Sequence, residues 1–272
     1  MKPTLLARIS TVAVAMLLSL TLFAQSTGVA AQDAPAPAPS PTPDRGPTFQ
    51  HDAPAGSLRL AGPPPPVGDV IVEDSLTAPG AIPGRLDSVT GRNVGEFVGE
   101  GYIMKVTGRF REDSQTAGIG GIIPELVVPD GEIRIEMKVV SGHDRALAYI
   151  SFREQTDPPA FYEVNLAPSV GLAFLGRSVP NDLKMLPLAT RSDLRGRMSR
   201  DDWNQFAVRL DGPNIWILLN GEPILSVADS ARDSGRVGIG VMRAGDLNDN
   251  AESAVVFRNL RVSRLAPRPP AQ

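Results

Sequence analysis

Apolar and polar side chains alternate along many short segments between residues 69 and 265. Residues 132–140 (EIRIEMKVV) place an isoleucine, methionine or valine at every second position, with charged residues between them. A period of two is typical of a β-strand that buries one face. Similar segments lie at 146–153, 161–166, 236–242 and 253–263. The pattern therefore predicts a domain built from strands.

Turn residues between the segments predict how the strands connect. Residues 204–227 contain the pairs Asp211-Gly212 and Asn220-Gly221, which favour tight hairpins because they tolerate positive φ. Three antiparallel strands are expected there in succession. The only helical hint is one short turn at 199–204, with Ser199 as a candidate N-cap.

The strands are expected to form a layered all-β fold. About ten to thirteen strands without helices predict an antiparallel sandwich or barrel. Roughly 200 residues exceed one seven-stranded immunoglobulin-like unit, so the chain suits a larger two-sheet antiparallel jelly-roll sandwich.

The N-terminus has the pattern of a targeting signal. Lys2 and Arg8 precede an uncharged, mostly apolar stretch at 9–24, and Val29-Ala30-Ala31 fits a cleavage site. Residues 1–31 are therefore expected to be a signal peptide. A retained anchor is the alternative, although the stretch is short for a membrane span. The protein is expected to be secreted or extracytoplasmic, in the periplasm or at the cell surface, with no membrane span after signal cleavage.

A proline-rich segment separates this signal from the domain. Eleven of the 26 prolines lie in residues 32–68, which favours extended polyproline II and prevents sheet formation. Because large apolar residues are scarce there, we interpret 32–68 as a disordered linker that acts as a semi-rigid spacer. The β-sandwich domain is expected at 69–265, followed by a disordered tail at 266–272.

The composition excludes several kinds of chemistry. The chain has no Cys and two His, which excludes Cys-ligated metals and disulfides and argues against multi-His sites. It has 27 Lys+Arg and 30 Asp+Glu with no basic run, so no nucleic-acid partner is expected. Residues 246–252 alternate oxygen-bearing side chains as calcium loops do, but Ala251 and Phe257 replace the required Gly and Glu. An ordinary polar loop is preferred, and neither a metal nor a cofactor is expected.

Residues in a fixed order carry a resemblance to a known group of proteins. They are 101–106 (GYIMKV), 152–153 (FR), 161–164 (FYEV), 203–204 (WN), 220–221 (NG), Asp229, 234–238 (SGRVG) and 256–262 (VFRNLRV). This order resembles the concanavalin A-like lectin/glucanase superfamily, and in particular its laminin G-like and 3-keto-disaccharide hydrolase-like bacterial extracytoplasmic domains. The resemblance implies a concanavalin A-like sandwich over about 70–265. The closing motif of the family usually has Asp where this chain has Arg258, which puts any role of that Asp in doubt.

Known catalytic motifs are incomplete. Residues Glu132 and Glu136 have the spacing of the two catalytic acids of retaining β-glucanases, but Arg134 replaces the acid between them. A solvated strand face of alternating charge is preferred. His143 lies in a string with turn composition, so no Ser-His-Asp triad is expected. Residues 118–121 (GIGG) match no nucleotide-binding pattern and are interpreted as a flexible loop.

A mixed aromatic and polar face is the candidate ligand-binding site. Alternation places Tyr149, Ser151 and Arg153 on one face of the strand at 146–153, and Glu163 and Asn165 on one face of the strand at 161–166. Saccharides need such a mixture of ring surface and hydrogen-bonding groups. The alternative is a simple Arg153–Glu163 ion pair across neighbouring strands.

These observations lead to three hypotheses about function. The leading one is non-catalytic recognition of a glycan or other extracellular ligand, with no catalytic residue assigned. A glycoside hydrolase-like or 3-keto-disaccharide hydrolase-like enzyme, implied by the resemblance alone, is the second, and a structural envelope protein is the third. An enzyme requires two converging acids, one with a raised pKa. A binding module requires an exposed aromatic side chain without such a pair.

Overall fold

A computed structural model describes residues 63–80, 86–87, 93–107, 116–180, 185–244 and 251–267. The expected signal peptide, most of the proline-rich segment, the core of the 246–252 loop and residues 268–272 lie outside the described residues. Within these ranges every regular element is a strand, and no apolar helix of membrane-spanning length is present.

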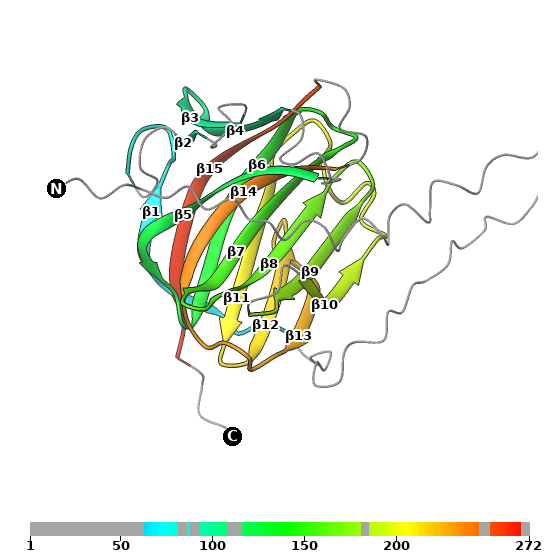
Figure 1. Ribbon diagram of the computed structural model, residues 1–272. Coiled ribbons are helices and arrows are strands. Elements are labelled where there is room, and N and C mark those ends of the chain that lie inside the picture. Colours follow the sequence, from blue (N-terminus) through cyan, green and yellow to red (C-terminus); the bar gives the residue numbers. More distant parts are fainter. Residues whose placement is uncertain are drawn as a thin grey trace, which may run out of the picture.

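The described strands form two antiparallel sheets that lie over each other (Figure 1). The nine-stranded sheet has the order β13-β12-β11-β6-β15-β4-β3-β2, and β1 also pairs with β15. Its strands are β1 (Val67–Asp74), β2 (Leu86–Asp87), β3 (Val94–Val98), β4 (Gly101–Thr107), β6 (Gly131–Ser141), β11 (Asn204–Asp211), β12 (Asn214–Leu219), β13 (Glu222–Ala228) and β15 (Glu252–Leu265).

The six-stranded sheet has the order β10-β9-β8-β7-β14-β5. Its strands are β5 (Thr116–Val127), β7 (Ala146–Thr156), β8 (Pro159–Ala167), β9 (Leu172–Ser178), β10 (Met185–Arg191) and β14 (Arg236–Ala244). The two sheets confirm the predicted all-β, concanavalin A-like jelly-roll sandwich.

Alternation along the strands builds the core between the sheets. Ile133, Ile135 and Met137 of β6 are buried in it, whereas the charged residues between them point to the outer face. On the six-stranded sheet, Ile150 and Phe152 of β7 belong to the same core. Each sheet therefore has one apolar inner face and one outer face that is free to carry other chemistry.

The three predicted strands at 204–227 are β11, β12 and β13, paired antiparallel in sequence order. Asn220 and Gly221 have φ of 51° and 83°, as the predicted tight turn requires. The other turn differs by one residue: Asp211 pairs with Asn214, so the two turn residues are Gly212 and Pro213.

Two local predictions are wrong. Residues 199–204 form no helix, because Asn204 accepts a hydrogen bond from Ser199 N (2.7 Å) and donates one to Ser199 O (2.7 Å), which closes an irregular loop. Residues 118–121 are not a flexible loop but lie inside β5, paired along their length with β14. This strand forms one edge of the six-stranded sheet.

Candidate functional site

The outer face of the six-stranded sheet brings together four of the five predicted ligand-binding residues. Tyr149 pairs with Asn165 across β7 and β8, and Ser151 pairs with Glu163 one step along. All four point away from the core between the sheets, because the inner positions hold residues such as Ile150. We call Tyr149, Ser151, Glu163 and Asn165 the polar quartet.

Glycines on the neighbouring strands make room for the polar quartet. Gly240 of β14 pairs with Tyr149 on one side and with Gly120 of β5 on the other. A Cβ atom at either glycine would come closer than 3.0 Å to the Tyr149 ring or hydroxyl, and one at Gly238 would come within 2.5 Å of Ser151 Oγ. The Tyr149 side chain therefore lies flat across a floor of main chain.

Glu163 is the chemically unusual member of the quartet. It is 2% exposed, and Asn165 Nδ2 donates a hydrogen bond of 2.8 Å to its carboxylate. Among the described residues, no Lys or Arg forms an ion pair with it. Burial raises the pKa of Glu163 from 4.5 to about 7, the Asn165 hydrogen bond opposes this rise and the charge of Glu154 adds to it. The carboxyl can therefore give up or accept a proton near neutral pH.

The surroundings of Glu163 supply further polar atoms. Ser151 Oγ donates a 3.4 Å hydrogen bond to Glu154. The pKa of the Tyr149 hydroxyl is raised well above its ordinary value by burial and by the charges of Glu163 and Glu154, so it stays protonated. Asn165 Oδ1 is buried without a hydrogen-bond partner in the described part of the chain. Two carboxyl groups, one phenol and an unsatisfied amide oxygen thus converge on this face.

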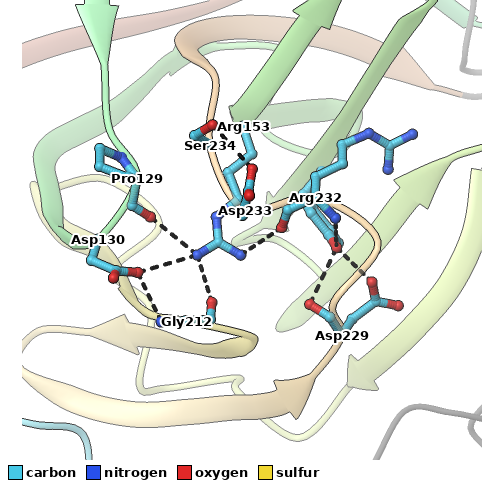
Figure 2. Close-up of polar contacts among 9 residues, drawn as sticks. Pro129, Asp130, Arg153, Gly212, Asp229, Arg232, Asp233 and Ser234 are labelled. Carbon is cyan, nitrogen blue, oxygen red and sulfur yellow. Dashed lines mark hydrogen bonds and ion pairs between the residues drawn. The ribbon is translucent and has the colours of Figure 1, made fainter.

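Arg153 does not join the quartet, in contrast to the prediction. It has a φ of 50° in a β-bulge between Phe152 and Gln155, which breaks the alternation along β7. Its side chain is fully buried and donates to the carbonyls of Arg232 (2.9 Å), Pro129 (3.1 Å) and Gly212 (2.6 Å), as Figure 2 shows. It forms no ion pair with Glu163, so the alternative prediction for this pair is also wrong.

Arg153 instead ties together loops at one end of the sandwich. Pro129, Gly212 and Arg232 belong to the β5–β6, β11–β12 and β13–β14 connections. Beside them, Tyr162 donates a 2.5 Å hydrogen bond to Asp229. These internal contacts fix the three loops relative to one another.

The Glu132-Arg134-Glu136 string lies on the outer face of the other sheet and carries no free acid pair. Glu132 is ion-paired with Arg209 and Arg134, and Arg258 Nε donates to Glu136 at 2.7 Å. Arg258 also stacks on Trp203, 3.7 Å from the ring centroid. Glucanase-type catalysis at this string has no support.

The remaining candidates are also structural. His143 lies in the turn between β6 and β7, as predicted, with Nε2 3.4 Å from Asp201 Oδ1. Trp216 is buried with Ala207 and Leu218 in a small cluster outside the main core. In the described ranges no group of three or more His, Asp or Glu side chains could hold a metal ion.

Sequence reasoning missed the glycine floor and Glu154. A signal for the first was available, because Gly118 and Gly120, like Gly238 and Gly240, alternate with apolar residues at strand period. Nothing in the sequence pattern pointed to Glu154. Regular alternation along β7 would place it on the inner face, and the bulge at Arg153 brings it to the outer face instead. The ligand-binding role of the polar quartet stays a prediction.

Several solved structures resemble this chain at low identity. A carbohydrate binding module, CBM66, of Bacillus subtilis is 14% identical, with a TM-score of 0.46 over 67% of this chain and 93% of that chain. A Bacillus subtilis protein with a galectin-like fold is 13% identical, with a TM-score of 0.49 over 74% and 99%. A Bacillus licheniformis β-glucanase is 8% identical, with a TM-score of 0.46 over 79% and 95%. Likenesses this distant say nothing about ligand or activity.

Among curated proteins, none matches the sequence. One family model does match, and its description is "3-keto-alpha-glucoside-1,2-lyase-like domain". The match covers residues 84–263, from just before β2 to two residues before the end of β15. It therefore includes the whole six-stranded sheet and the polar quartet. It confirms the resemblance predicted from the order of residues along the chain. The chain belongs to the family of 3-keto-alpha-glucoside-1,2-lyase-like domains.

Proposed function

We propose that this chain is an extracytoplasmic carbohydrate-active domain that binds a 3-keto glucoside on the polar quartet and uses Glu163 as an acid–base group. The observation that carries the proposal is the buried Glu163 carboxyl, whose pKa of about 7 suits proton transfer at neutral pH. The presence of a second acid, Glu154, close enough to raise that pKa favours an enzyme over a binding module. Tyr149 is buried on this face and Phe174, the cross-strand partner of Asn165, is half-buried, so among the described residues neither of these two rings is a fully exposed sugar platform.

The family description indicates a reaction that this face can support. A keto group at C3 of a sugar makes the neighbouring C2–H acidic. Glu163 in its ionised form would remove the C2 proton, and the electron pair would form the C1–C2 double bond while the C1–O bond breaks. The departing oxygen takes up a proton, so that the products are an unsaturated keto sugar and a free alcohol.

The other members of the quartet would hold the substrate. The Tyr149 hydroxyl stays protonated at neutral pH, so it can donate to an oxygen that gains negative charge, such as the C3 oxygen. Asn165 holds Glu163 through Nδ2 and leaves Oδ1 to accept from a sugar hydroxyl. Positioning of this kind and acid–base help each account for orders of magnitude in rate.

The test is turnover of a 3-keto disaccharide by the purified protein, followed by mass spectrometry of the products. Glu163→Gln should lower kcat by about 100-fold or more and leave binding within a few-fold, since Gln keeps the hydrogen bond to Asn165 but cannot take a proton. Glu73→Gln, which removes an exposed carboxyl on β1, is the control and should leave both unchanged.

Two outcomes would contradict an enzyme. Tight binding of saccharides without any turnover by the wild-type protein would support the non-catalytic binding module, and neither binding nor turnover would support a structural envelope protein. The extracytoplasmic location is tested separately, by fractionating cells that express the full chain and a variant without residues 1–31. Retention of only the shortened form in the cytoplasm is expected.

A further inference from the structure

The polar quartet is bounded differently on its two sides. On the β14 side, the space above Gly240 is occupied by the Tyr149 ring, which a Cβ atom at this glycine would overlap. On the β9 side, Glu163 pairs with Gly176, and the sheet continues over β9 and β10 to its edge. A ligand larger than one sugar ring therefore extends from Glu163 over β9 and β10.

Phe174 forms part of the surface on that side. It is the cross-strand partner of Asn165, and its ring extends over the main chain of Gly176, because a Cβ atom there would lie 2.7 Å from Phe174 Cε1. The quartet is at most 6% exposed, whereas Phe174 is half-buried. On β10, its partner Thr190 is also half-buried, and Pro187, the partner of Gly176, is exposed. Ring surface next to the quartet is thus accessible to a ligand.

This part of the face offers few hydrogen-bonding groups. Its outward positions on β9 and β10 hold Phe174, Gly176, Ser178, Pro187 and Thr190, and none of these described residues carries a charge. Ser178 Oγ is already used, because it accepts from Phe161 N at 2.7 Å and donates to Phe161 O at 3.2 Å. A sugar requires several donors and acceptors, whereas an apolar ring requires only apolar surface. The surface beside Phe174 therefore suits an apolar ring.

The roles proposed for the quartet set the direction of the substrate. Glu163 on β8 takes the proton from C2, and Tyr149 on β7 donates to the oxygen on C3. In the sugar ring, C1 and C3 are bonded to opposite sides of C2. Because β8 lies between β7 and β9, the C1–O bond and the leaving group point away from Tyr149, toward Gly176 and the Phe174 ring.

We propose that the surface of Phe174 and Pro187 is the subsite for the leaving group, and that this group is an apolar ring. The preferred substrate is then a 3-keto glucoside of a phenol and not a 3-keto disaccharide. The proposal rests on the proposed function, because the roles of Glu163 and Tyr149 orient the sugar.

The chemistry of the leaving oxygen agrees with a phenol. As the C2 proton goes to Glu163, the C1–O bond breaks with its electron pair on oxygen, and the phenoxide then takes a proton from water. Among the described residues, no carboxyl group occupies an outward position on β9 or β10 to protonate this oxygen. A phenol has a pKa of about 10, as the tyrosine side chain does, and a sugar hydroxyl is far less acidic. A phenoxide therefore leaves without an acid beside it.

Binding of unreactive glucosides to the full chain tests the subsite without turnover. Methyl α-glucoside, phenyl α-glucoside and maltose have a hydroxyl group at C3, so their C2 proton is not acidic. In calorimetric titrations, phenyl α-glucoside should bind about tenfold more tightly than methyl α-glucoside, which corresponds to about 1.4 kcal/mol, and maltose should gain less than about threefold. Equal affinities for the phenyl and methyl glucosides, or an equal gain for maltose, would overturn the proposal.

Matched variants test the role of Phe174. Phe174→Ala should remove most of the phenyl gain and leave the Kd of methyl α-glucoside within about twofold. Gly176→Ala should also reduce the gain, because the new Cβ displaces the Phe174 ring. Phe97→Ala, which truncates a half-buried phenylalanine of β3 in the other sheet, is the control and should keep the gain. A phenyl gain that survives in a folded Phe174→Ala or Gly176→Ala protein would refute this role.

Turnover separates the subsite from the proposed function. Phenol released from phenyl 3-keto-α-glucoside is measured by absorbance. Turnover without a phenyl preference in binding would overturn the subsite and leave the proposed enzyme. A phenyl preference without turnover would overturn the enzyme and leave the subsite. Failure of the folded protein to bind any of the three glucosides would overturn both.

Discussion

Replacing Glu163 with Gln should make the folded protein more stable at neutral and alkaline pH. The wild-type carboxyl is 2% exposed, and among the described residues its one hydrogen-bond donor is Asn165. A neutral amide at the same place avoids the burial of a charge. The substitution therefore isolates the cost of ionising this one group in the folded protein.

The magnitude follows from the pKa of Glu163 in the two states. Folding raises this pKa from 4.5 to about 7, and each unit is worth 1.36 kcal/mol, so the full effect is about 3 kcal/mol. Because the folded pKa is the higher one, the folded state binds the proton more tightly. The contribution of the proton on Glu163 to the free energy of unfolding is fully present below pH 4.5 and is lost as the pH rises through about 7.

Urea unfolding between pH 4 and pH 8.5 measures this directly. The free energy of unfolding of Glu163→Gln should rise relative to wild type by about 3 kcal/mol between pH 4.5 and pH 7.5, and then stay level. Glu73→Gln on exposed β1 removes the same charge and should give a curve parallel to wild type. Parallel curves for both variants would show that Glu163 ionises normally, and the acid–base proposal would lose its basis.

Two predictions concern the positions of Tyr149 and Arg153. Gly240→Ala should lower stability in urea by about 1–3 kcal/mol, because the new Cβ overlaps the Tyr149 ring, and most of that loss should disappear in a Tyr149→Ala background. Gly99→Ala, where a Cβ meets nothing within 4 Å, is the control, and additive losses in the double variant would refute the overlap. Arg153→Met should lower the melting temperature and cost about 3 kcal/mol, because three loop carbonyls lose their donor. A loss below about 0.5 kcal/mol would mean that water replaces the guanidinium there.

The sequence was sufficient to predict the layered fold because alternation survives along most strands. In β6 the charged residues stay outside and the apolar ones inside over the whole strand, so the pattern and the structure agree. The same holds for the hairpin at Asn220 and Gly221, where two residues with positive φ are needed and both tolerate it. Local rules predict such features because no distant residue competes with them.

Predictions failed where a distant residue decided the local structure. Arg153 follows the alternation of β7 in sequence, yet carbonyls from three loops draw its guanidinium to the end of the sandwich, and the chain bulges to allow it. Residues 118–121 have the composition of a loop, yet all four pair with β14, and Tyr149 occupies the space that a Cβ at Gly120 would need. Neither partner can be read from the residues themselves.

The misplaced arginine and the unrecognised glycines together explain the chemistry of the candidate site. Had Arg153 stayed on the outer face, its charge would have lowered the pKa of Glu163 rather than leaving it raised. The bulge removes that cation and brings Glu154 close instead, which acts in the opposite direction. Glu163 pairs with two small residues, Ser151 on β7 and Gly176 on β9, and it is 2% exposed. The raised pKa of Glu163 thus depends on the fold around it. A prediction that treats β7 as a regular strand without the bulge would place Arg153 beside Glu163 and would not expect this rise.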